Sequence, residues 1–186
     1  VEAIAFNRQE KSDKFMRETF SSYLSADLLK QLIANPDSLK LGGERKELSI
    51  LFSDIRGFTT LSESMSPEDL IKVLNRYLTP MTYSVIENGG MLDKYIGDAV
   101  MAFFNAPVDV EKHADASCLC ALSMVEKLND LNKELHLDGI AAIKIGIGIN
   151  TAEVVVGNIG SESKKEYTII GDGVNLASRV ESLTKR

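Results

Sequence analysis

Apolar runs of strand length alternate with amphipathic helical segments along this chain, and their order constrains the fold more than any other feature of the sequence. Residues 47–55 form an apolar run that predicts a first strand. The sequence Ser-Pro-Glu-Asp at 66–69 then supplies an N-cap, an early proline and two acids, so a helix is predicted from about position 67 to the Asn-Gly-Gly of 88–90. A strand followed by a long helix indicates a layered domain that contains both kinds of element.

The remaining segments extend this pattern with hairpins. Gly97-Asp98 interrupts an apolar stretch, which predicts two short strands joined by a turn. The predicted elements after the first helix are two strands in 91–104, a helix at 110–135, strands at 140–150 and 152–159, and a closing helix at 171–183. The order β-α-β-β-α-β-β-α indicates an α+β sandwich in which helices pack on a mainly antiparallel sheet.

The N-terminal part of the chain differs from the rest. Apolar residues recur at helical spacing in 8–34 until an Asn-Pro pair, which predicts an N-terminal helical arm. A glycine-containing linker follows, so the predicted organisation is an arm and linker at 1–43 and a globular domain at 44–186. The apolar face of the arm predicts packing against a partner, a preceding signalling helix or the domain itself. Because the sequence starts with Val1 and ends inside a helical stretch, we interpret it as a piece of a longer chain.

Composition argues against some classes of function. The 186 residues, 44% of them hydrophobic, suit one α/β domain with a sizeable core. The formal net charge of -6 and the pI near 5.0 argue against nucleic acid as a partner, although local cations and a metal can hold a small anion. No apolar run reaches the ~18 residues of a membrane span and no signal peptide is visible, so we expect a soluble, cytoplasmic domain whose parent protein can still be membrane-anchored.

Two aspartates stand where predicted strands end or turn. Asp54 lies near the end of the first strand and Asp98 in the hairpin turn, so a shared sheet would bring both carboxylates to one edge. A divalent cation would relieve their repulsion, and Mg²⁺ is commonly held by one or two carboxylates together with water and phosphate oxygens. Gly57 frees nearby backbone N–H groups to approach a phosphate. The alternative is that Asp54 caps a turn and Asp98 fills the hairpin.

Three motifs, found in order, give the chain a family resemblance. The segments FSDIRGFT (52–59), KYIGDAVMA (94–102) and YTIIGDGVNLASRVE (167–181) resemble those of the class III nucleotidyl cyclases, which make cyclic AMP or cyclic GMP. The resemblance covers roughly 47–184 and implies the class III cyclase fold, with a ferredoxin-like β-α-β-β-α-β sandwich core. It also implies that the domain is truncated at its C-terminal end, since family members continue into further strands that carry a lysine for the triphosphate.

The resemblance implies a metal site built on Asp54, Asp98 and the backbone carbonyl of Ile55, which match the family's ligands for two divalent cations, Mg²⁺ or Mn²⁺. Two metals would activate the ribose 3′-oxygen and neutralise the phosphates, so the aspartates would hold metal and would not be nucleophiles. The predicted substrate-binding backbone beside the phosphates is that of Gly57, Phe58 and Thr59.

Four further residues match the family's base-reading and catalytic positions. Lys94 matches the purine-reading lysine, and Thr168 matches a position that is aspartate or threonine in adenylyl cyclases. Asn175 and Arg179 match the pair taken to orient the ribose and to stabilise the pentavalent phosphorus, and a spacing of four places both on one helix face. Without that context, Lys94 would be an ordinary strand-surface lysine and Arg179 a solvated helix residue. Lysine with threonine fits adenine, whereas guanine readers of this family tend to have an acid and a cysteine there.

The implied activity is that of an adenylate cyclase, a phosphorus-oxygen lyase that converts ATP to 3′,5′-cyclic AMP and pyrophosphate by in-line attack of the ribose 3′-oxygen on the α-phosphorus. Guanylyl cyclase is the nearest alternative, and a non-catalytic nucleotide-binding or dimerisation module derived from a cyclase is another. Diguanylate cyclases are disfavoured because their Gly-Gly-Asp-Glu-Phe signature is absent. The implied partners are ATP, a second copy of the chain in a homodimer with composite active sites, and an upstream sensor or signalling domain in the parent chain.

Overall fold

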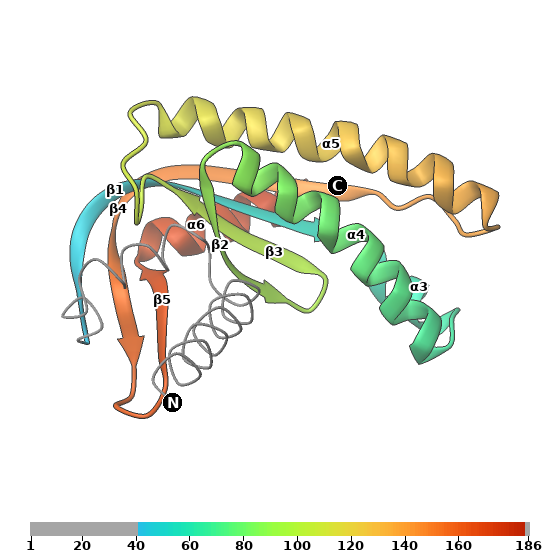
Figure 1. The fold of residues 1–186 in the computed structure, drawn as a ribbon, viewed down its shortest axis with the longest axis horizontal. Coiled ribbons are helices and arrows are strands. Elements are labelled where there is room, and N and C mark those ends of the chain that lie inside the picture. The colour runs from blue at the N-terminus through green and yellow to red at the C-terminus, as the bar shows by residue number, and fades with distance from the viewer. Residues whose placement is uncertain (1–40, 185–186) are drawn as a thin grey trace, which may run out of the picture. The chain divides into compact units, whose positions relative to one another are not determined.

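The longest strand pair holds the centre of the sheet. In a computed structural model of the protein, which describes residues 41–184, β1 (Gly42–Ile55) pairs along its whole length with β4 (Ile145–Gly160). The strand order is β2-β3-β1-β4-β5, and every neighbouring pair is antiparallel (Figure 1). The other three strands are β2 (Gly90–Ile96), β3 (Ala99–Phe104) and β5 (Lys165–Ile170).

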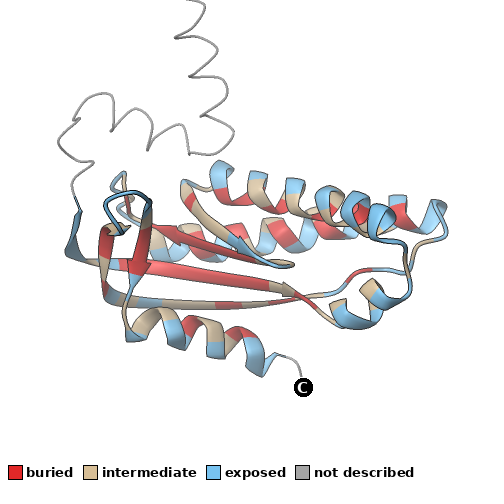
Figure 2. Ribbon diagram, turned by 90° about the horizontal axis from the view of Figure 1, so that it is seen from below, coloured by how far each residue is buried: buried red, intermediate tan, exposed pale blue. Residues whose placement is uncertain are grey.

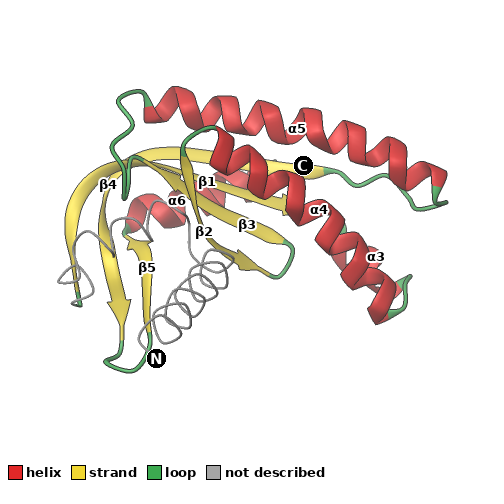
Figure 3. Ribbon diagram, viewed as in Figure 1, coloured by secondary structure: helices red, strands yellow, loops and turns green. Residues whose placement is uncertain are grey.

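Helices cover both faces of this sheet. The long helices α4 (Pro67–Glu87) and α5 (His113–Leu137) lie together on one face, whereas α6 (Asp172–Leu183) lies against the opposite face (Figure 2). The short helix α3 (Phe58–Glu63) follows β1 directly and leads into α4, as Figure 3 shows. The described part of the chain is therefore a three-layer arrangement with the sheet in the middle.

Burial along β1 reflects the alternation of side chains between the two faces of a strand. Leu51 and Ile55 are buried toward α4 and α5, and Phe52 is buried on the face that α6 covers. The main core is completed by buried side chains of the two long helices, which are Val73, Tyr77, Met81 and Val85 from α4 and Cys120, Met124, Leu128, Leu131 and Leu135 from α5. This apolar core holds the end of β1, and the residues that follow it, in a fixed position.

The N-terminus of α4 forms as the sequence predicts. The side-chain oxygen of Ser66 accepts a hydrogen bond of 3.2 Å from the backbone N–H of Asp69, and Pro67 occupies the first helical position. The helix ends at Glu87, and Gly89 follows with a positive φ of 73°. A serine cap satisfies an N–H group that has no partner within the helix, and glycine accepts the left-handed backbone that ends it.

The other face depends on a close contact between α6 and β4 at Gly148. A Cβ atom added to Gly148 would lie 2.2 Å from the backbone nitrogen of Glu181 and 2.5 Å from the carbonyl oxygen of Ala177. Only glycine therefore allows the α6 backbone to approach the strand this closely. The contact fixes the distance of α6 from the sheet. This helix carries two of the predicted catalytic residues.

The predicted fold class is confirmed, because β1, α4, β2, β3, α5 and β4 follow the β-α-β-β-α-β order with helices packed on an antiparallel sheet. Several element boundaries were wrong. The two strands predicted at 140–150 and 152–159 are one continuous strand, β4, and β5 was missed altogether. The first strand begins at Gly42, inside the predicted linker, because pairing with β4 extends it.

The predicted helical arm lies outside the described residues, and the boundary between arm and domain remains a prediction. Within residues 41–184, no helix combines the length and the apolar character that crossing a membrane requires.

Candidate active site

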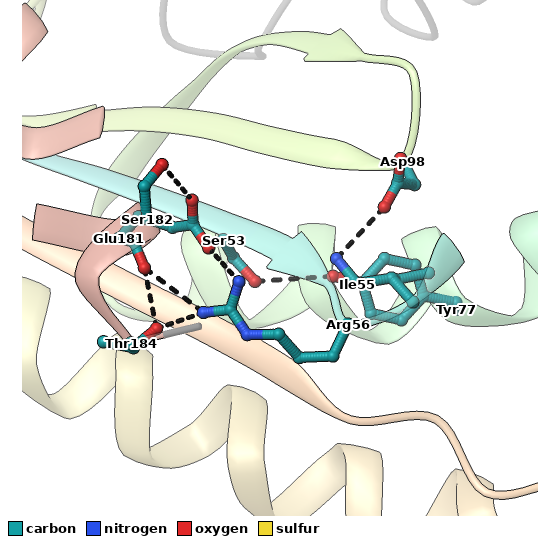
Figure 4. Close-up of polar contacts among 8 residues, drawn as sticks. All are labelled: Ser53, Ile55, Arg56, Tyr77, Asp98, Glu181, Ser182 and Thr184. Carbon is teal, nitrogen blue, oxygen red and sulfur yellow. Dashed lines mark hydrogen bonds and ion pairs between the residues drawn. The ribbon is translucent and has the colours of Figure 1, made fainter. Parts of the chain in front are cut away.

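Asp54 and Asp98 meet at one end of the sheet. β1 pairs with β3, with Ser53 opposite Val100, so the end of β1 lies beside the turn that precedes β3. The backbone N–H of Ile55 donates a hydrogen bond of 3.1 Å to Oδ2 of Asp98, which ties the turn to the end of β1 (Figure 4). The fold thus brings together two carboxylates that are distant in the sequence.

A pocket of about 380 Å³ surrounds the two carboxylates. Burial and the neighbouring Asp54 carboxylate raise the pKa of Asp98 to about 6, because both disfavour its charged form. The pocket is lined by Asp54, Ile55, Arg56, Gly57, Phe58, Thr59 and Asp98. All residues predicted for metal and phosphate binding therefore line the same pocket.

The chain turns sharply between the residues predicted to bind metal and α3. Gly57 has a left-handed backbone with φ 69° and ψ 27°, and it stands at the N-cap of α3. A residue with a Cβ atom would be strained in this conformation. The first N–H groups of a helix have no partners within the helix, and here Phe58 and Thr59, the first two residues of α3, line the pocket.

The donor set fits a hard divalent cation. Two carboxylates share the pocket with Ile55, whose carbonyl is the third oxygen ligand that the family resemblance implies. Within residues 41–184, no three histidine, cysteine, aspartate or glutamate side chains are grouped as a metal site. One or two carboxylates with further oxygen ligands from water and phosphate are typical of Mg²⁺, whereas zinc sites usually have more protein ligands.

Lys94 and Thr168 come together through Asp93, a residue that the sequence analysis missed. The Thr168 hydroxyl donates a hydrogen bond of 2.6 Å to Oδ2 of Asp93, and Lys94 Nζ lies 3.6 Å from Oδ1 of the same carboxylate. Lys94 also donates a hydrogen bond of 2.7 Å to Glu166. An acid inside the apolar run MLDKYI was the available signal for Asp93.

Pairing and burial shift the pKa values of Lys94, Glu166 and Asp93. Hydrogen bonding to Glu166, together with the charge of Asp93, raises the pKa of Lys94, and the same bond lowers the pKa of Glu166. Burial raises the pKa of Asp93, although its bonds to Thr168 and Lys94 oppose that shift. Lys94 is therefore held as a cation that can donate to a ligand.

Asn175 and Arg179 lie elsewhere. Both are exposed on α6, and neither belongs to the pocket that contains Asp54 and Asp98. The guanidinium of Arg179 is 3.7 Å from the carboxylate of Asp172, and its side chain is 66% exposed. One copy of the chain therefore does not bring all predicted site residues into one pocket.

A second feature that the sequence analysis missed joins the pocket to α6. Arg56, next to Ile55, extends across β4 and donates a hydrogen bond of 2.6 Å to the Glu181 carboxylate and one of 3.2 Å to the Glu181 carbonyl (Figure 4). It also donates to the Thr184 hydroxyl. The Glu181 side chain is only 6% exposed, so this is a buried ion pair between the pocket loop and α6.

Comparison with known proteins gives one family. The family described as "Adenylate and Guanylate cyclase catalytic domain" matches residues 43–186. An adenylate cyclase of Anabaena cylindrica is 38% identical over 189 residues, which cover 98% of this chain and 36% of that protein. The chain thus spans little more than a third of the length of that relative.

Two solved structures share both sequence and fold with the chain. The adenylyl cyclase CyaB from P. aeruginosa is 42% identical with a TM-score of 0.74, and the match covers 77% of this chain and 74% of that one. The guanylyl cyclase Cya2 is 41% identical with a TM-score of 0.74, covering 77% of this chain and 73% of that one.

Proposed function

The chain belongs to the family of adenylate and guanylate cyclase catalytic domains, and on that premise we propose that it converts ATP to 3′,5′-cyclic AMP and pyrophosphate. The observation that carries this proposal is the meeting of Asp54 and Asp98 in one pocket with Ile55 and the start of α3. Two neighbouring carboxylates support cation binding, and the adjacent start of α3 supports phosphate binding.

In this proposal the carboxylates of Asp54 and Asp98 and the carbonyl of Ile55 hold two divalent cations, Mg²⁺ or Mn²⁺. When bound, these cations neutralise the triphosphate and make the ribose 3′-hydroxyl easier to deprotonate. The backbone of Gly57, Phe58 and Thr59 contributes N–H groups toward the phosphates. The raised pKa of Asp98 supports this role, since a site that disfavours two neighbouring negative charges gains from a cation.

The reaction forms a bond between the ribose 3′-oxygen and the α-phosphorus, breaks the bond from that phosphorus to the pyrophosphate oxygen, and releases the 3′-hydroxyl proton. Asn175 orients the ribose, and Arg179 stabilises the charge on the α-phosphate oxygens through its forked guanidinium. Side chains of the protein form no covalent intermediate. Catalysis then consists mainly of positioning and charge stabilisation, as in other phosphoryl transfers.

We propose further that the active sites form between two copies of the chain. Asp54 and Asp98 would come from one copy, while Lys94, Thr168, Asn175 and Arg179 would come from the other. The exposure of Asn175 and Arg179, away from the carboxylate pocket, supports this arrangement. In a two-fold homodimer the same surfaces serve twice, so each dimer would have two equivalent sites.

Adenine is the proposed base because Lys94 and Thr168 lie on either side of one carboxylate and both can hydrogen-bond a purine edge. Conversion of GTP is the second candidate, since the guanylyl cyclase Cya2 is 41% identical and CyaB 42%. We also propose a cytoplasmic location, and a sensor or signalling domain before the domain boundary near position 44 in the parent protein.

Product analysis tests the proposal. The chain, and a longer form that includes the C-terminal strands of the family, are incubated separately with ATP and with GTP in the presence of Mn²⁺, and the products are identified by mass spectrometry. Cyclic AMP should form faster than cyclic GMP. A preference for GTP would select the second candidate, and no cyclic product from the longer form would support a non-catalytic module.

A further inference from the structure

The outermost strands of the sheet carry side chains that contact each other. β2 and β5 stand at opposite ends of the strand order, yet Thr168 on β5 bonds to Asp93 on β2, and Glu166 on β5 bonds to Lys94 on β2. Figure 3 shows β4 arching strongly before the chain turns back into β5. The sheet is therefore curled enough to bring its two edges within side-chain reach.

Asp93 occupies a β-bulge, which explains why its side chain points toward β5 as that of its neighbour Lys94 does. Leu92 pairs with Ala102 on β3 and Lys94 pairs with the next residue, Met101, so Asp93 is an extra residue in the ladder. Neighbouring side chains in a regular strand point to opposite faces, and a bulge re-aims one of them. As a result Asp93 and Lys94 both reach residues of β5.

The Asp93 carboxylate is buried between its two partners. Its side chain is 1% exposed, while that of Lys94 is 36% exposed. A buried carboxylate is costly unless it is paired and hydrogen-bonded, and the Thr168 hydroxyl and the Lys94 ammonium meet this requirement. The Asp93 side chain is thus shielded from solvent, whereas Lys94 keeps an accessible ammonium group.

The direction of the hydrogen bond determines what Thr168 can offer a ligand. A hydroxyl has one proton and two lone pairs. Because an ionised carboxylate only accepts hydrogen bonds, the Thr168 proton is used in the 2.6 Å bond to Asp93. The oxygen of Thr168, a buried residue in the single chain, then has only acceptor capacity left for a ligand. An acceptor fits an amino group on a ligand and is mismatched with a carbonyl oxygen.

We propose that Asp93 is a positioning residue for nucleobase selection, which fixes Thr168 as an acceptor and so favours a purine with a 6-amino group over one with a 6-carbonyl group. This inference rests on the proposed function, since it assumes that Lys94 and Thr168 contact the base. Asp93 itself is buried behind Thr168 and acts through it. Lys94 complements the pair, because its ammonium donates to an acceptor on the same purine edge.

The test measures base preference directly. The probes are ATP and inosine triphosphate, which carries a carbonyl where ATP has the 6-amino group and lacks the 2-amino group of GTP. The variant is Asp93→Asn, whose amide can donate to Thr168 and so frees the threonine proton for a ligand carbonyl. The ratio of kcat/KM for ATP to that for inosine triphosphate should fall by about tenfold, as expected when one hydrogen-bond mismatch is removed.

Asp69→Asn is the matched control. Asp69 also bonds to a hydroxyl and a lysine, with Ser66 at 2.9 Å and Lys72 at 2.8 Å, but it lies at the start of α4. Its substitution should leave the ratio within about twofold of the unmodified chain, since no base-reading hydroxyl depends on it. A similar fall in this variant would mean that the ratio reports general disturbance and would overturn the inference.

A double variant separates base reading from structure. Thr168→Val removes the hydroxyl, so adding Asp93→Asn to it should change the ratio no further. Folding is checked by thermal unfolding, and Asp93→Ser replaces Asp93→Asn if the latter does not fold. An unchanged ratio in the folded variant, or failure of both to fold, would assign Asp93 to the fold alone and overturn the inference. Absence of any cyclic product from the unmodified longer form would instead refute the proposed function.

Discussion

Asp98 shares its pocket with a second carboxylate, and this makes the folding stability of the metal-free protein depend on pH. Its folded pKa of about 6 exceeds the ordinary value of 3.8, so the folded state binds more protons than the unfolded state between these values. Stability from this group is therefore lost as pH rises through that window. Asp98→Asn removes this titration. In EDTA, we therefore expect the free energy of unfolding of the variant, relative to that of the unmodified protein, to be greater at pH 7.5 than at pH 4.5.

Urea unfolding at the two pH values measures this difference. Asp69→Asn serves as a control, because hydrogen bonds from Lys72 and Ser66 lower the pKa of Asp69 below its ordinary value of 3.8. The stability that this carboxylate contributes is lost only as pH falls below that value, so the cost of removing it should be nearly the same at pH 4.5 and pH 7.5. A relative stability of Asp98→Asn that stays constant with pH would contradict the coupling between the two pocket carboxylates.

Substitution of either pocket carboxylate should also stop turnover. Asp54→Asn and Asp98→Asn each remove one of the two proposed charged metal ligands while keeping side-chain size, so we expect a loss of more than ~100-fold in cyclase rate, as for other preorganised charge stabilisers. Far-UV circular dichroism should stay unchanged, and Mn²⁺ binding measured by calorimetry should weaken. Near-normal activity of either variant in Mg²⁺ would refute the metal assignment.

Local sequence contained enough information to place these carboxylates. It marks Asp93 as an acid within an apolar run, but it does not predict the contacts of Asp93. Asp54 and Asp98 each follow or interrupt an apolar run, and pairing of adjacent strands then brings them together. The role of Asp93 depends on a bulge and on the approach of two sheet edges. The bulge is defined by the pairing of β2 with β3 and the approach of the edges by the shape of the whole sheet, so neither can be predicted from the local sequence.

At the scale of elements, the ion pair between Arg56 and Glu181 connects the pocket loop to α6. Arg56→Ala would leave the Glu181 carboxylate buried without its partner, and breaking a buried pair in this way costs about 3 to 5 kcal/mol. We expect a loss of this size in the free energy of unfolding from chemical denaturation. Turnover should fall as well, since α6 carries Asn175 and Arg179.

Arg76→Ala is a matched control for that variant. Arg76 also bonds to two acids, Glu134 and Asp138, but both acids are exposed near the end of α5, and Arg76, in the middle of α4, is itself partly exposed. Solvent screens such pairs, so the loss of stability should be much smaller than for Arg56→Ala. Equal losses in the two variants would show that burial of the pair near α6 has little energetic effect.

The errors in predicting strands have the same physical origin as the missed contacts. Thr151 appeared as a break between two strands, but it pairs with Ser49, and Asn150 before it pairs with Ile50, within a continuous ladder. Long-range pairing with β1 overrides the weak local preference of these polar residues for a turn. β5 was missed because it is short and half of its residues are polar. What identifies it as a strand is its pairing with β4.

At the scale of the whole molecule, the predicted site residues fall into two separate groups. Asp54 and Asp98 line one pocket, whereas Arg179 is exposed on α6 outside it. A chain that works alone would have to bring Arg179 into that pocket. In the proposed two-fold homodimer, each copy would instead present its pocket to the exposed residues of the other.

Complementation between inactive variants tests this arrangement. Asp54→Asn and Arg179→Ala should each be inactive as homodimers, because both sites of each dimer lack one essential residue. After mixing and subunit exchange, a mixed dimer contains one site that lacks both residues and one site that is intact. If equal mixing gives half of the dimers in this form, and each has one of two sites intact, activity should recover to about a quarter of the unmodified level. Mixed dimers that form, as shown by native mass spectrometry, but remain inactive would refute the shared site and place all essential residues within one copy.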